Sequence, residues 1–439
     1  MKTLRAIRSI CLALAALLSV QAYAAQMTWL GTTEMSSGRG ERGPWQQNDS
    51  RYDYVDDPAV AIDDAGEISI AWVEQGRKDV LFQRISPDGV KRLAQPVNIS
   101  RSPTTFSWLP RVVIAPDNPK TIFVLWQEII FAGGSHGGDI LFARSIDGGA
   151  TFSPPLNLSN SVGGDGKGRI NKDVWHNGSL DIVAGRDGAI YAAWTEYDGL
   201  LWFVRSTDGG KTFSRPQQLA GGGDARPVRG PTLAIGPGRT IFLAWTTGED
   251  DAADIHLMQS ADGGAQFSKP AVVARTATYS DAPKLAVDRA GVIHLVHAES
   301  NGGPFQTYRV HYMRSEDGGR TFSARRELAK PDGDAGAAFP SIALDERGRL
   351  LVMWERYPPG QRRPRGLALA ISDDGGRNFT APEVVPESSD PAGGTNGSHQ
   401  GLLMEKLAMN GAGAVAIVNS SLKQDDKSRV WLTRGRLLR

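Results

Sequence analysis

The chain has 439 residues, of which 49 are Lys or Arg and 48 are Asp or Glu, so its formal net charge at pH 7 is +1. This near-neutral balance gives no support for binding to nucleic acid or to a membrane surface. The 51 glycines and 25 prolines predict short strands that are joined by many turns.

The start of the chain has the composition of a Sec-type signal peptide. Three basic residues among the first eight precede an apolar run over 10–20, and Ala22-Tyr-Ala24 is a small-x-small cleavage signal. The apolar run is too short to span a membrane, and the only cysteine is Cys11. We therefore expect residues 1–24 to be removed, which changes the net charge from +1 to −2. Residues 25–439 are then expected to form a single periplasmic or extracellular domain that is free of disulfides, monomeric and not inserted in a membrane.

An eight-residue pattern, Ser-x-Asp-Gly-Gly-x-x-Phe, organises the rest of the chain. It occurs five times, at residues 145–152, 206–213, 260–267, 315–322 and 372–379, after a partial copy at 86–89. The starts are separated by 59, 61, 54, 55 and 57 residues, a period that indicates a repeat architecture. Each copy predicts a hairpin turn, because the Asp side chain can accept backbone N–H groups and the glycines reach positive φ.

Each repeat contains the pattern of four antiparallel strands. First strands are expected to start near residues 58, 110, 179, 231, 283 and 340. Second strands are expected to end near Trp72, Trp126, Trp194, Trp245, His297 and Trp354. A third strand leads into the octapeptide and a fourth leaves it, and such units repeated around an axis are the blades of a β-propeller.

The end of the chain contains the start of a further repeat, which has no octapeptide of its own. Residues 406–413 match residues 284–291, and 429–434 have the pattern of a third strand, but no fourth strand follows. We expect residues 27–31 to supply the missing strand and to close the ring. The fold class is therefore an all-β propeller of four-stranded antiparallel blades, for which we favour seven blades over the alternative of six.

Long polar connections at 36–57, 159–176 and 386–400 all join a fourth strand to the next first strand. These connections share one face of a propeller with the loops between second and third strands, so we expect a binding surface there. Aromatic planes suit a sugar, and arginines suit an anion. The candidate ligand-binding residues on this face are Trp108, Trp175, His176, Arg226, Arg229, Asp281, Arg356 and His399.

The octapeptide resembles the Asp-box, or BNR repeat, of sialidases and related β-propellers. The resemblance covers nearly all of the expected mature chain, although the catalytic domains of sialidases have six blades. It implies an arginine triad for the substrate carboxylate, a Tyr nucleophile paired with a Glu, and an Asp acid/base. Under this hypothesis the nucleophile is Tyr357, paired with Glu355, or Tyr197, and the acid/base is Asp57 or Asp281. Arg229 and Arg356 would then hold the carboxylate.

The catalytic motifs of the sialidase family are not found in this sequence. Their first arginine usually lies in an Arg-Ile-Pro motif, but the matching place has Asp56-Asp-Pro58, and Arg229-Gly-Pro231 is the nearest echo. We therefore favour a secreted propeller that binds a glycan or a protein partner without turnover. The alternative is an exo-sialidase-like glycoside hydrolase that acts on an anionic sugar, so whether the chain is an enzyme stays open.

No metal or cofactor site is predicted. His294 and His297 are three residues apart on an expected strand and so face opposite sides of it. No phosphate-cradling loop, nucleophile elbow or HExxH motif occurs.

Overall fold

A computed structural model describes residues 25–44, 46, 49–102, 104–129, 138–159, 169–171, 174–175, 179–196, 199–222, 225–248, 252–275, 278–303, 306–397 and 405–438. Within these residues the structure is all β apart from η1 (Pro237–Arg239), a single turn of 3-10 helix. A search of the same residues for a helix with the length and apolar character needed to cross a membrane finds none.

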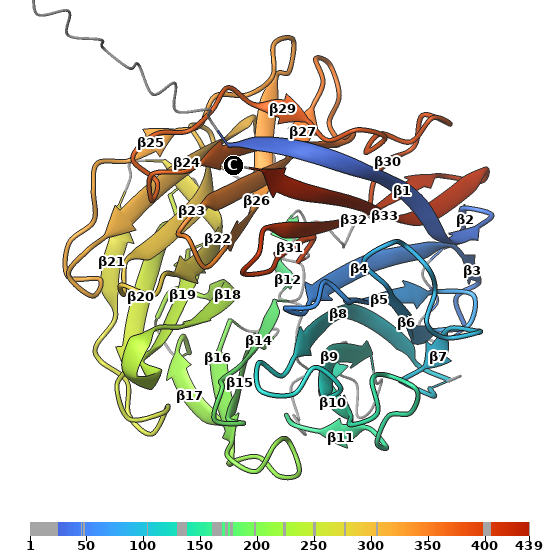
Figure 1. Ribbon diagram of the computed structural model, residues 1–439, viewed down its shortest axis with the longest axis horizontal. Helices are drawn as coiled ribbons and strands as arrows, with labels where there is room; N and C mark the ends of the chain where they lie inside the picture. Colours follow the sequence, from blue (N-terminus) through green and yellow to red (C-terminus); the bar gives the residue numbers. More distant parts are fainter. Residues whose placement is uncertain are drawn as a thin grey trace, which may run out of the picture.

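Seven antiparallel sheets are arranged in a ring, so the protein is a seven-bladed β-propeller (Figure 1). Six sheets have four strands and the seventh has five. We number the blades 1 to 7 in chain order, starting with the sheet that contains β4. The prediction of seven blades, rather than six, is confirmed.

In blades 1 to 6 the four strands run in chain order from the axis of the ring to its rim, whereas the outermost strand of blade 7 comes from the N-terminal end of the described chain. The first strands are β4 (Val55–Ile62), β8 (Phe106–Ile114), β14 (Leu180–Ala184), β18 (Val228–Ile235), β22 (Tyr279–Val287), β26 (Gly336–Leu344) and β31 (Leu407–Met409). The second strands are β5 (Ile68–Glu74), β9 (Ile122–Ile129), β15 (Ile190–Thr195), β19 (Ile241–Thr247), β23 (Ile293–Ser300), β27 (Leu350–Tyr357) and β32 (Ala414–Lys423).

The third strands are β6 (Asp79–Ile85), β10 (Gly138–Ser145), β16 (Leu201–Ser206), β20 (Asp254–Ser260), β24 (Tyr308–Ser315), β28 (Leu367–Ser372) and β33 (Lys427–Leu438). The fourth strands are β7 (Val97–Asn98), β11 (Leu156–Asn157), β17 (Gln217–Ala220), β21 (Ala271–Ala274), β25 (Arg326–Glu327), β29 (Glu383–Val384) and, from the other end of the chain, β1 (Gln26–Gly38). The remaining strands are β2 (Glu41–Arg42), β3 (Tyr52–Asp53), β12 (Arg169–Asn171), β13 (Val174–Trp175) and β30 (Thr395–Asn396).

The ring is closed by pairing the two ends of the described chain. Strand β1 pairs antiparallel with β33, from Gln26 opposite Leu438 to Gly38 opposite Ser428. Figure 1 shows this pair as a blue strand beside a dark red one. The N-terminal segment therefore supplies the outer strand of blade 7, as the sequence predicts, and blade 7 has no exposed rim edge on β33.

The repeated octapeptides form nearly identical turns. In blade 3, Ser206 Oγ donates to Asp208 Oδ1 at 2.8 Å and accepts from the N–H of Gly210 at 3.0 Å. The same Asp208 Oδ1 accepts from the N–H of Thr212 at 3.0 Å. The residue before each Ser joins neighbouring blades, since Arg144 Nη1 of blade 2 donates to the carbonyl oxygen of Gly209 at 3.1 Å. These groups are therefore used in building and joining the blades.

The hydrophobic core lies between successive blades. Each apolar cluster combines residues of two neighbours, as in the cluster that holds Phe203 of blade 3 and Leu243 of blade 4. A tryptophan near the end of the second strand is at most 1% exposed in five blades: Trp72, Trp126, Trp194, Trp245 and Trp354. In blades 1 and 2 its indole N–H is directed at the glutamate two residues later, at 3.4 and 3.5 Å. The recurrent Trp-x-Glu pattern is thus part of the blade architecture.

Five first strands begin three or four residues before the predicted proline starts. In each, the residue before the proline has φ between 50° and 61° and interrupts the register of pairing with the second strand. These residues are Asp57, Leu109, Gly230, Ala282 and Phe339. Such a β-bulge adds a residue to one strand, so the alternation of apolar residues is broken there and the sequence pattern hides the start of the strand.

Candidate functional site

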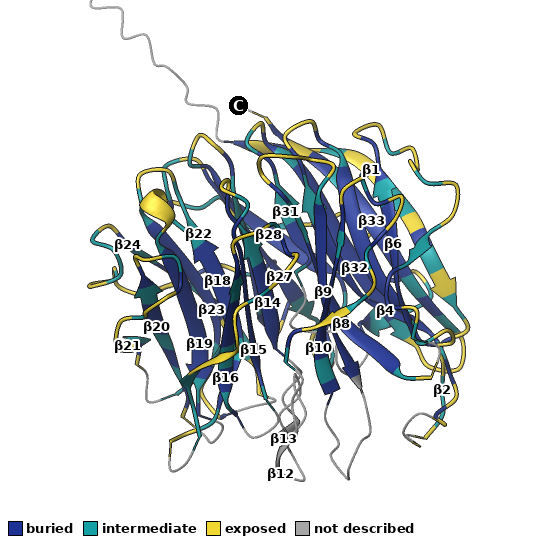
Figure 2. Ribbon diagram, turned by 90° about the horizontal axis from the view of Figure 1, so that it is seen from below, coloured by how far each residue is buried: buried dark blue, intermediate teal, exposed yellow. Residues whose placement is uncertain are grey.

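The two faces of the ring have different loops. The strand directions place the Ser-x-Asp-Gly-Gly turns on the same face as the C-terminus, at the upper side of Figure 2. The opposite face carries the connections between blades and those between second and third strands, together with the β2–β3 pair. We refer to this opposite face as the connection face. The predicted site residues that the structure describes lie on the connection face or on the ends of the strands that lead to it.

The first strands of blades 2 to 5 enclose a small pocket. The residues that line it are Arg111, Ser179, Leu180, Gly230, Pro231, Ala282, Pro283 and Lys284. Only about 10 Å³ is open to the centre of a water molecule, which is roughly the space for one water. A sugar ring does not fit in this pocket.

Asp181 lies on β14 beside this pocket and is buried. Its carboxylate accepts N–H groups of Ile182 at 2.9 Å and of Leu233, in the next blade, at 2.7 Å. Burial first, and then the charge of Glu405, raise the pKa of Asp181 to about 6, whereas Lys284 and Arg111 act to lower it. This charged group was not among the site residues predicted from the sequence.

The predicted carboxylate clamp is not assembled, because each of its arginines has a local partner. Arg229 is buried, forms an ion pair with Asp281 at 3.2 Å and donates to the Tyr279 hydroxyl at 2.5 Å. Arg356 holds both carboxylate oxygens of Asp334, at 2.8 and 2.9 Å. The clamp residues thus lie in separate ion pairs of blades 4–5 and blade 6.

Three more predicted residues have surroundings that suit a structural role. The exposed Arg226 donates to the carbonyl oxygen of Ala252. Asp57 is fully buried, and its Oδ2 accepts the N–H of Leu109 in the next blade at 3.1 Å. Trp108 is 1% exposed and packs in the core with Leu109. All three are therefore engaged within or between blades.

Glu355 and Tyr357 lie on the same face of β27, but Glu355 is bound elsewhere. Its two carboxylate oxygens accept hydrogen bonds from Lys406 Nζ and from Asn396 Nδ2, and all three side chains are at most 3% exposed. Burial first, and then the negative charge of Glu355, raise the pKa of Tyr357 well above its usual range, against the opposing effect of Arg363. The Tyr357 hydroxyl is therefore neutral at pH 7.

Two arginines that were not among the predicted site residues are coupled electrostatically to Tyr357. They are Arg42 on β2 and Arg363 in the loop between β27 and β28, and both are partly buried. The charge of Arg363 affects the pKa of Tyr357, and the charge of Arg42 affects the pKa of Arg363. The pKa of Arg363 is lowered first by burial and second by the positive charge of Arg42, while Tyr357 and Asp56 oppose the shift. Among the described residues, neither guanidinium has an ion pair or hydrogen bond to a carboxylate.

A second tyrosine belongs to the same group. Tyr54 is 1% exposed, and its hydroxyl has no hydrogen-bond partner in the described part of the chain. Burial raises its pKa well above the usual range, and the next largest influence, from Arg42, lowers it. We call Arg42, Tyr54, Tyr357 and Arg363 the Arg–Tyr site.

The Arg–Tyr site lies where blades 6, 7 and 1 meet on the connection face. Its neighbour Asp56 accepts the hydroxyl of Ser420, at the end of blade 7, at 2.6 Å. Asn396, which binds Glu355, also donates its backbone N–H to Pro364 in the loop that carries Arg363. Two cationic groups near the partly buried ring of Tyr357 can hold an anion, and that ring can pack against an apolar face of a ligand, whereas the ring of Tyr54 is buried.

The sequence offered a partial signal for this site. Arg42 lies in the long 36–57 connection, which was predicted to belong to a binding surface. Arg363 lies in an Arg362-Arg-Pro-Arg365 run of a loop that was not singled out. Tyr197, His176 and His399 lie outside the described residues, and so does the side chain of Trp175.

No protein-family model matches the chain, and no curated protein sequence matches it. Solved structures do match. An ulvan lyase of polysaccharide lyase family 25, bound to -[GlcA(1-4)Rha3S]-, aligns with a TM-score of 0.56 and 12% identity over 92% of this chain and 95% of that one.

Two further structures are similar. The GH93 α-L-arabinofuranosidase of Fusarium graminearum, in complex with arabinobiose, aligns with a TM-score of 0.51 and 15% identity over 77% of this chain and 94% of that one. A protein of unknown function from Dyadobacter fermentans aligns with a TM-score of 0.50 and 16% identity over 78% of this chain and 98% of that one. At these identities the similarity shows the propeller fold alone.

Proposed function

We propose that this chain is a secreted propeller that binds an anionic glycan at the Arg–Tyr site without turning it over. The observation that carries the proposal is the pair Arg42 and Arg363, two partly buried guanidinium groups that have no carboxylate partner in the described residues. Bringing like charges together is unfavourable, and an anion between them relieves the repulsion. Guanidinium groups suit carboxylate and sulfate oxygens because they donate two parallel hydrogen bonds.

Tyr357 and the similar structures support a glycan rather than a small inorganic anion. The partly buried ring of Tyr357 offers an apolar face next to the cationic groups, which is the combination that binds sugars. Two of the similar propellers are a polysaccharide lyase bound to a GlcA-containing unit and an arabinofuranosidase. The resemblance of the turns to the Asp-box of sialidases also favours a glycan as the ligand. An acidic protein loop is the other ligand that this chemistry could accept.

Binding without turnover is favoured because the Tyr–Glu pair is not poised for reaction. A tyrosine nucleophile requires a base to remove its proton. Glu355 already accepts hydrogen bonds from Lys406 and Asn396, and the pKa of Tyr357 is raised by burial and by Glu355. In addition, Arg229 and Arg356 hold Asp281 and Asp334 rather than converging on a substrate carboxylate.

The binding proposal is tested by calorimetric titration of the purified mature protein with 3′-sialyllactose, a glucuronate oligosaccharide and neutral lactose. Arg363→Ala and Arg42→Ala are each expected to weaken binding of the acidic glycan by about 10- to 100-fold, since a hydrogen bond to a charged group contributes about 1.5–3 kcal/mol. Arg362→Ala is the matched control, because this neighbouring side chain is exposed. Equal affinity for acidic and neutral sugars, or no binding of either, would overturn the proposal.

Hydrolysis of a fluorogenic sialic-acid glycoside tests the alternative of an exo-sialidase-like hydrolase. We expect no turnover above the blank for the folded protein. Turnover that is lost in Tyr357→Phe would replace the binding proposal with the hydrolase. Secretion is tested separately by sequencing the N-terminus of the exported protein, which should begin at Ala25.

A further inference from the structure

Blade 5 departs from the other blades at a buried position. The five blades named above place a tryptophan near the end of the second strand, whereas blade 5 has His297 there. His297 is fully buried, and the residue two positions later is Glu299, as in the Trp-x-Glu pattern of blades 1 and 2. An imidazole is smaller than an indole and, unlike it, has a nitrogen lone pair that can bind a metal ion.

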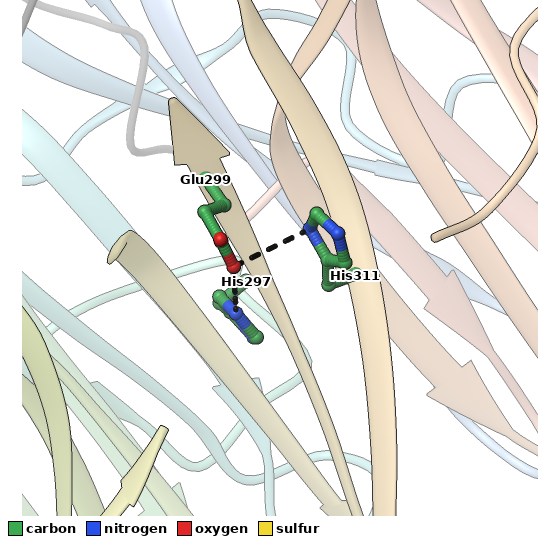
Figure 3. A group of neighbouring side chains, drawn as sticks. All are labelled: His297, Glu299 and His311. Carbon is green, nitrogen blue, oxygen red and sulfur yellow. Dashed lines mark ion pairs between the residues drawn. The ribbon is translucent and has the colours of Figure 1, made fainter. Parts of the chain in front are cut away.

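A second histidine is brought to the same place by strand pairing. His297 and Glu299 lie on one face of β23 because side chains alternate along a strand. His311 of β24 is directly opposite His297 in the antiparallel register. Figure 3 shows the Glu299 carboxylate close to both imidazole rings. The spacing of His294 and His297 on one strand does not reveal the His297–His311 pair, because that pair depends on the register between β23 and β24.

The distances within this cluster are too long for hydrogen bonds but suit a shared ion. Glu299 Oε2 is 3.6 Å from His297 Nε2 and 3.8 Å from His311 Nδ1. One ligand atom of each residue can be chosen so that all three lie within 4.8 Å of one another. In a tetrahedral site with bonds of about 2.0–2.1 Å, ligand atoms are about 3.3–3.4 Å apart. A contraction of a few tenths of an ångström would bring these two distances into that range, and the two imidazole nitrogens lie within 4.8 Å of each other.

The imidazole nitrogens are available in the described part of the chain. Neither ring nitrogen of His297 has a hydrogen-bond partner there, and the same holds for Nδ1 of His311. A buried polar group without a partner is costly, so this arrangement calls for a compensating ligand. The side chain of His311 is 15% exposed, which leaves one side of the cluster open to solvent for a fourth ligand.

Two neighbours hold the carboxylate in place, and one of them competes with an ion. Thr278 Oγ1 donates to Glu299 Oε1 at 2.8 Å, so it orients the carboxylate from behind. Arg325 Nη1 lies 2.7 Å from Oε2, the oxygen that faces both histidines. The Arg325 side chain is 37% exposed and can withdraw into solvent when an ion takes its place.

From this geometry we propose that His297, Glu299 and His311 bind one divalent first-row transition metal ion. Two imidazole nitrogens and one carboxylate oxygen with an open position suit Zn²⁺ in particular. The site would link β23 to β24 where other blades use a tryptophan. It is independent of the Arg–Tyr site, which lies on blades 6, 7 and 1.

The test is a titration of chelator-treated mature protein with Co²⁺, followed by visible absorption, and with Zn²⁺, followed by calorimetry. We expect one ion per chain and the intense visible bands of tetrahedral Co²⁺. His297→Gln and His311→Gln should each weaken Zn²⁺ binding at least tenfold. His256→Gln is the matched control, because this half-buried histidine of blade 4 packs against Trp245 and is outside the cluster. The control is needed since the chain has 7 histidines.

A variant with the opposite expected effect separates a metal site from a structural cluster. Arg325→Ala removes the competing cation from Glu299, so it should tighten Zn²⁺ binding, and it changes a partly exposed side chain. Zn²⁺ should also raise the unfolding midpoint of the wild type and of Arg325→Ala but not of His311→Gln. No stoichiometric binding by the wild type, or equal affinity in the wild type and both His variants, would overturn the proposal.

Discussion

Replacing either glycine of the Gly-Gly pair in an octapeptide by alanine measures how tightly successive blades are packed. In blade 3 both glycines have positive φ, +71° for Gly209 and +77° for Gly210. A methyl group added at Gly209 meets no atom within 4 Å. One added at Gly210 would lie 2.7 Å from Cζ of Phe142, in the preceding blade, and 3.0 Å from Cδ1 of Ile190. The two positions thus share backbone strain and differ in packing.

The expected losses of unfolding free energy follow from this difference. Alanine in the left-handed region costs about 1 kcal/mol relative to glycine, and Gly209→Ala should lose only that. Gly210→Ala also forces the Phe142 ring to move within a packed core, which costs about 1–3 kcal/mol more. We therefore expect a loss of about 2–4 kcal/mol for Gly210→Ala.

Urea unfolding followed by tryptophan fluorescence measures both losses as shifts of the midpoint at an unchanged slope. The pair in blade 4 is an independent replicate, because a methyl group at Gly264 would lie 2.7 Å from the Phe203 ring while one at Gly263 would be 3.6 Å from its nearest neighbour. Equal losses at the two positions of a pair would refute the conclusion that the second glycine is required by contact with the preceding blade.

Three further outcomes are expected. The pKa of Asp181 is raised to about 6, so the stabilisation from its protonated form is fully present below about pH 4. It is lost as the pH rises through about 6, and the free energy of unfolding should then fall by about 3 kcal/mol. Asp181→Asn should flatten this part of the stability profile, and parallel profiles for the wild type and the variant would contradict the prediction. Tyr54→Phe should leave the unfolding midpoint unchanged or higher, because the buried hydroxyl has no hydrogen-bond partner in the described residues, and a lower midpoint would count against that assignment. Deleting Gln26–Gly38 removes the strand that closes the ring, so the shortened chain should elute from gel filtration as expanded or aggregated material rather than as a compact monomer.

The repeat turns show why the sequence was sufficient for the fold. Every hydrogen bond within the Ser206–Thr212 turn joins residues at most four positions apart. Local chemistry of this kind is visible in a linear sequence, and its even spacing indicates a repeat, while the seventh blade was inferred from the match of residues 406–413 to residues 284–291. The closing strand was also predicted, because the last unit lacked a fourth strand and residues 27–31 were expected to supply it.

The candidate site was only partly predictable. The connection face and Tyr357 were selected from the repeat alignment, and the structure places Tyr357 in the Arg–Tyr site. Arg229 was selected because it breaks the repeat, but it pairs with Asp281 of the next blade. A residue that departs from a repeat can do so for a contact between blades as well as for a ligand, and the sequence does not distinguish the two.

The amino-acid sequence by itself therefore determined the architecture: turns, strand order, blade number and ring closure, all of which follow from local patterns and their period. Only the tertiary structure decided which side chains meet. Arg42 and Arg363 are 321 positions apart in the sequence, and His311 reaches His297 only through the register of two strands. The physical reason is that ring closure and strand pairing set distances between residues that have no fixed separation in sequence, and the free energy of burying charges depends on those distances.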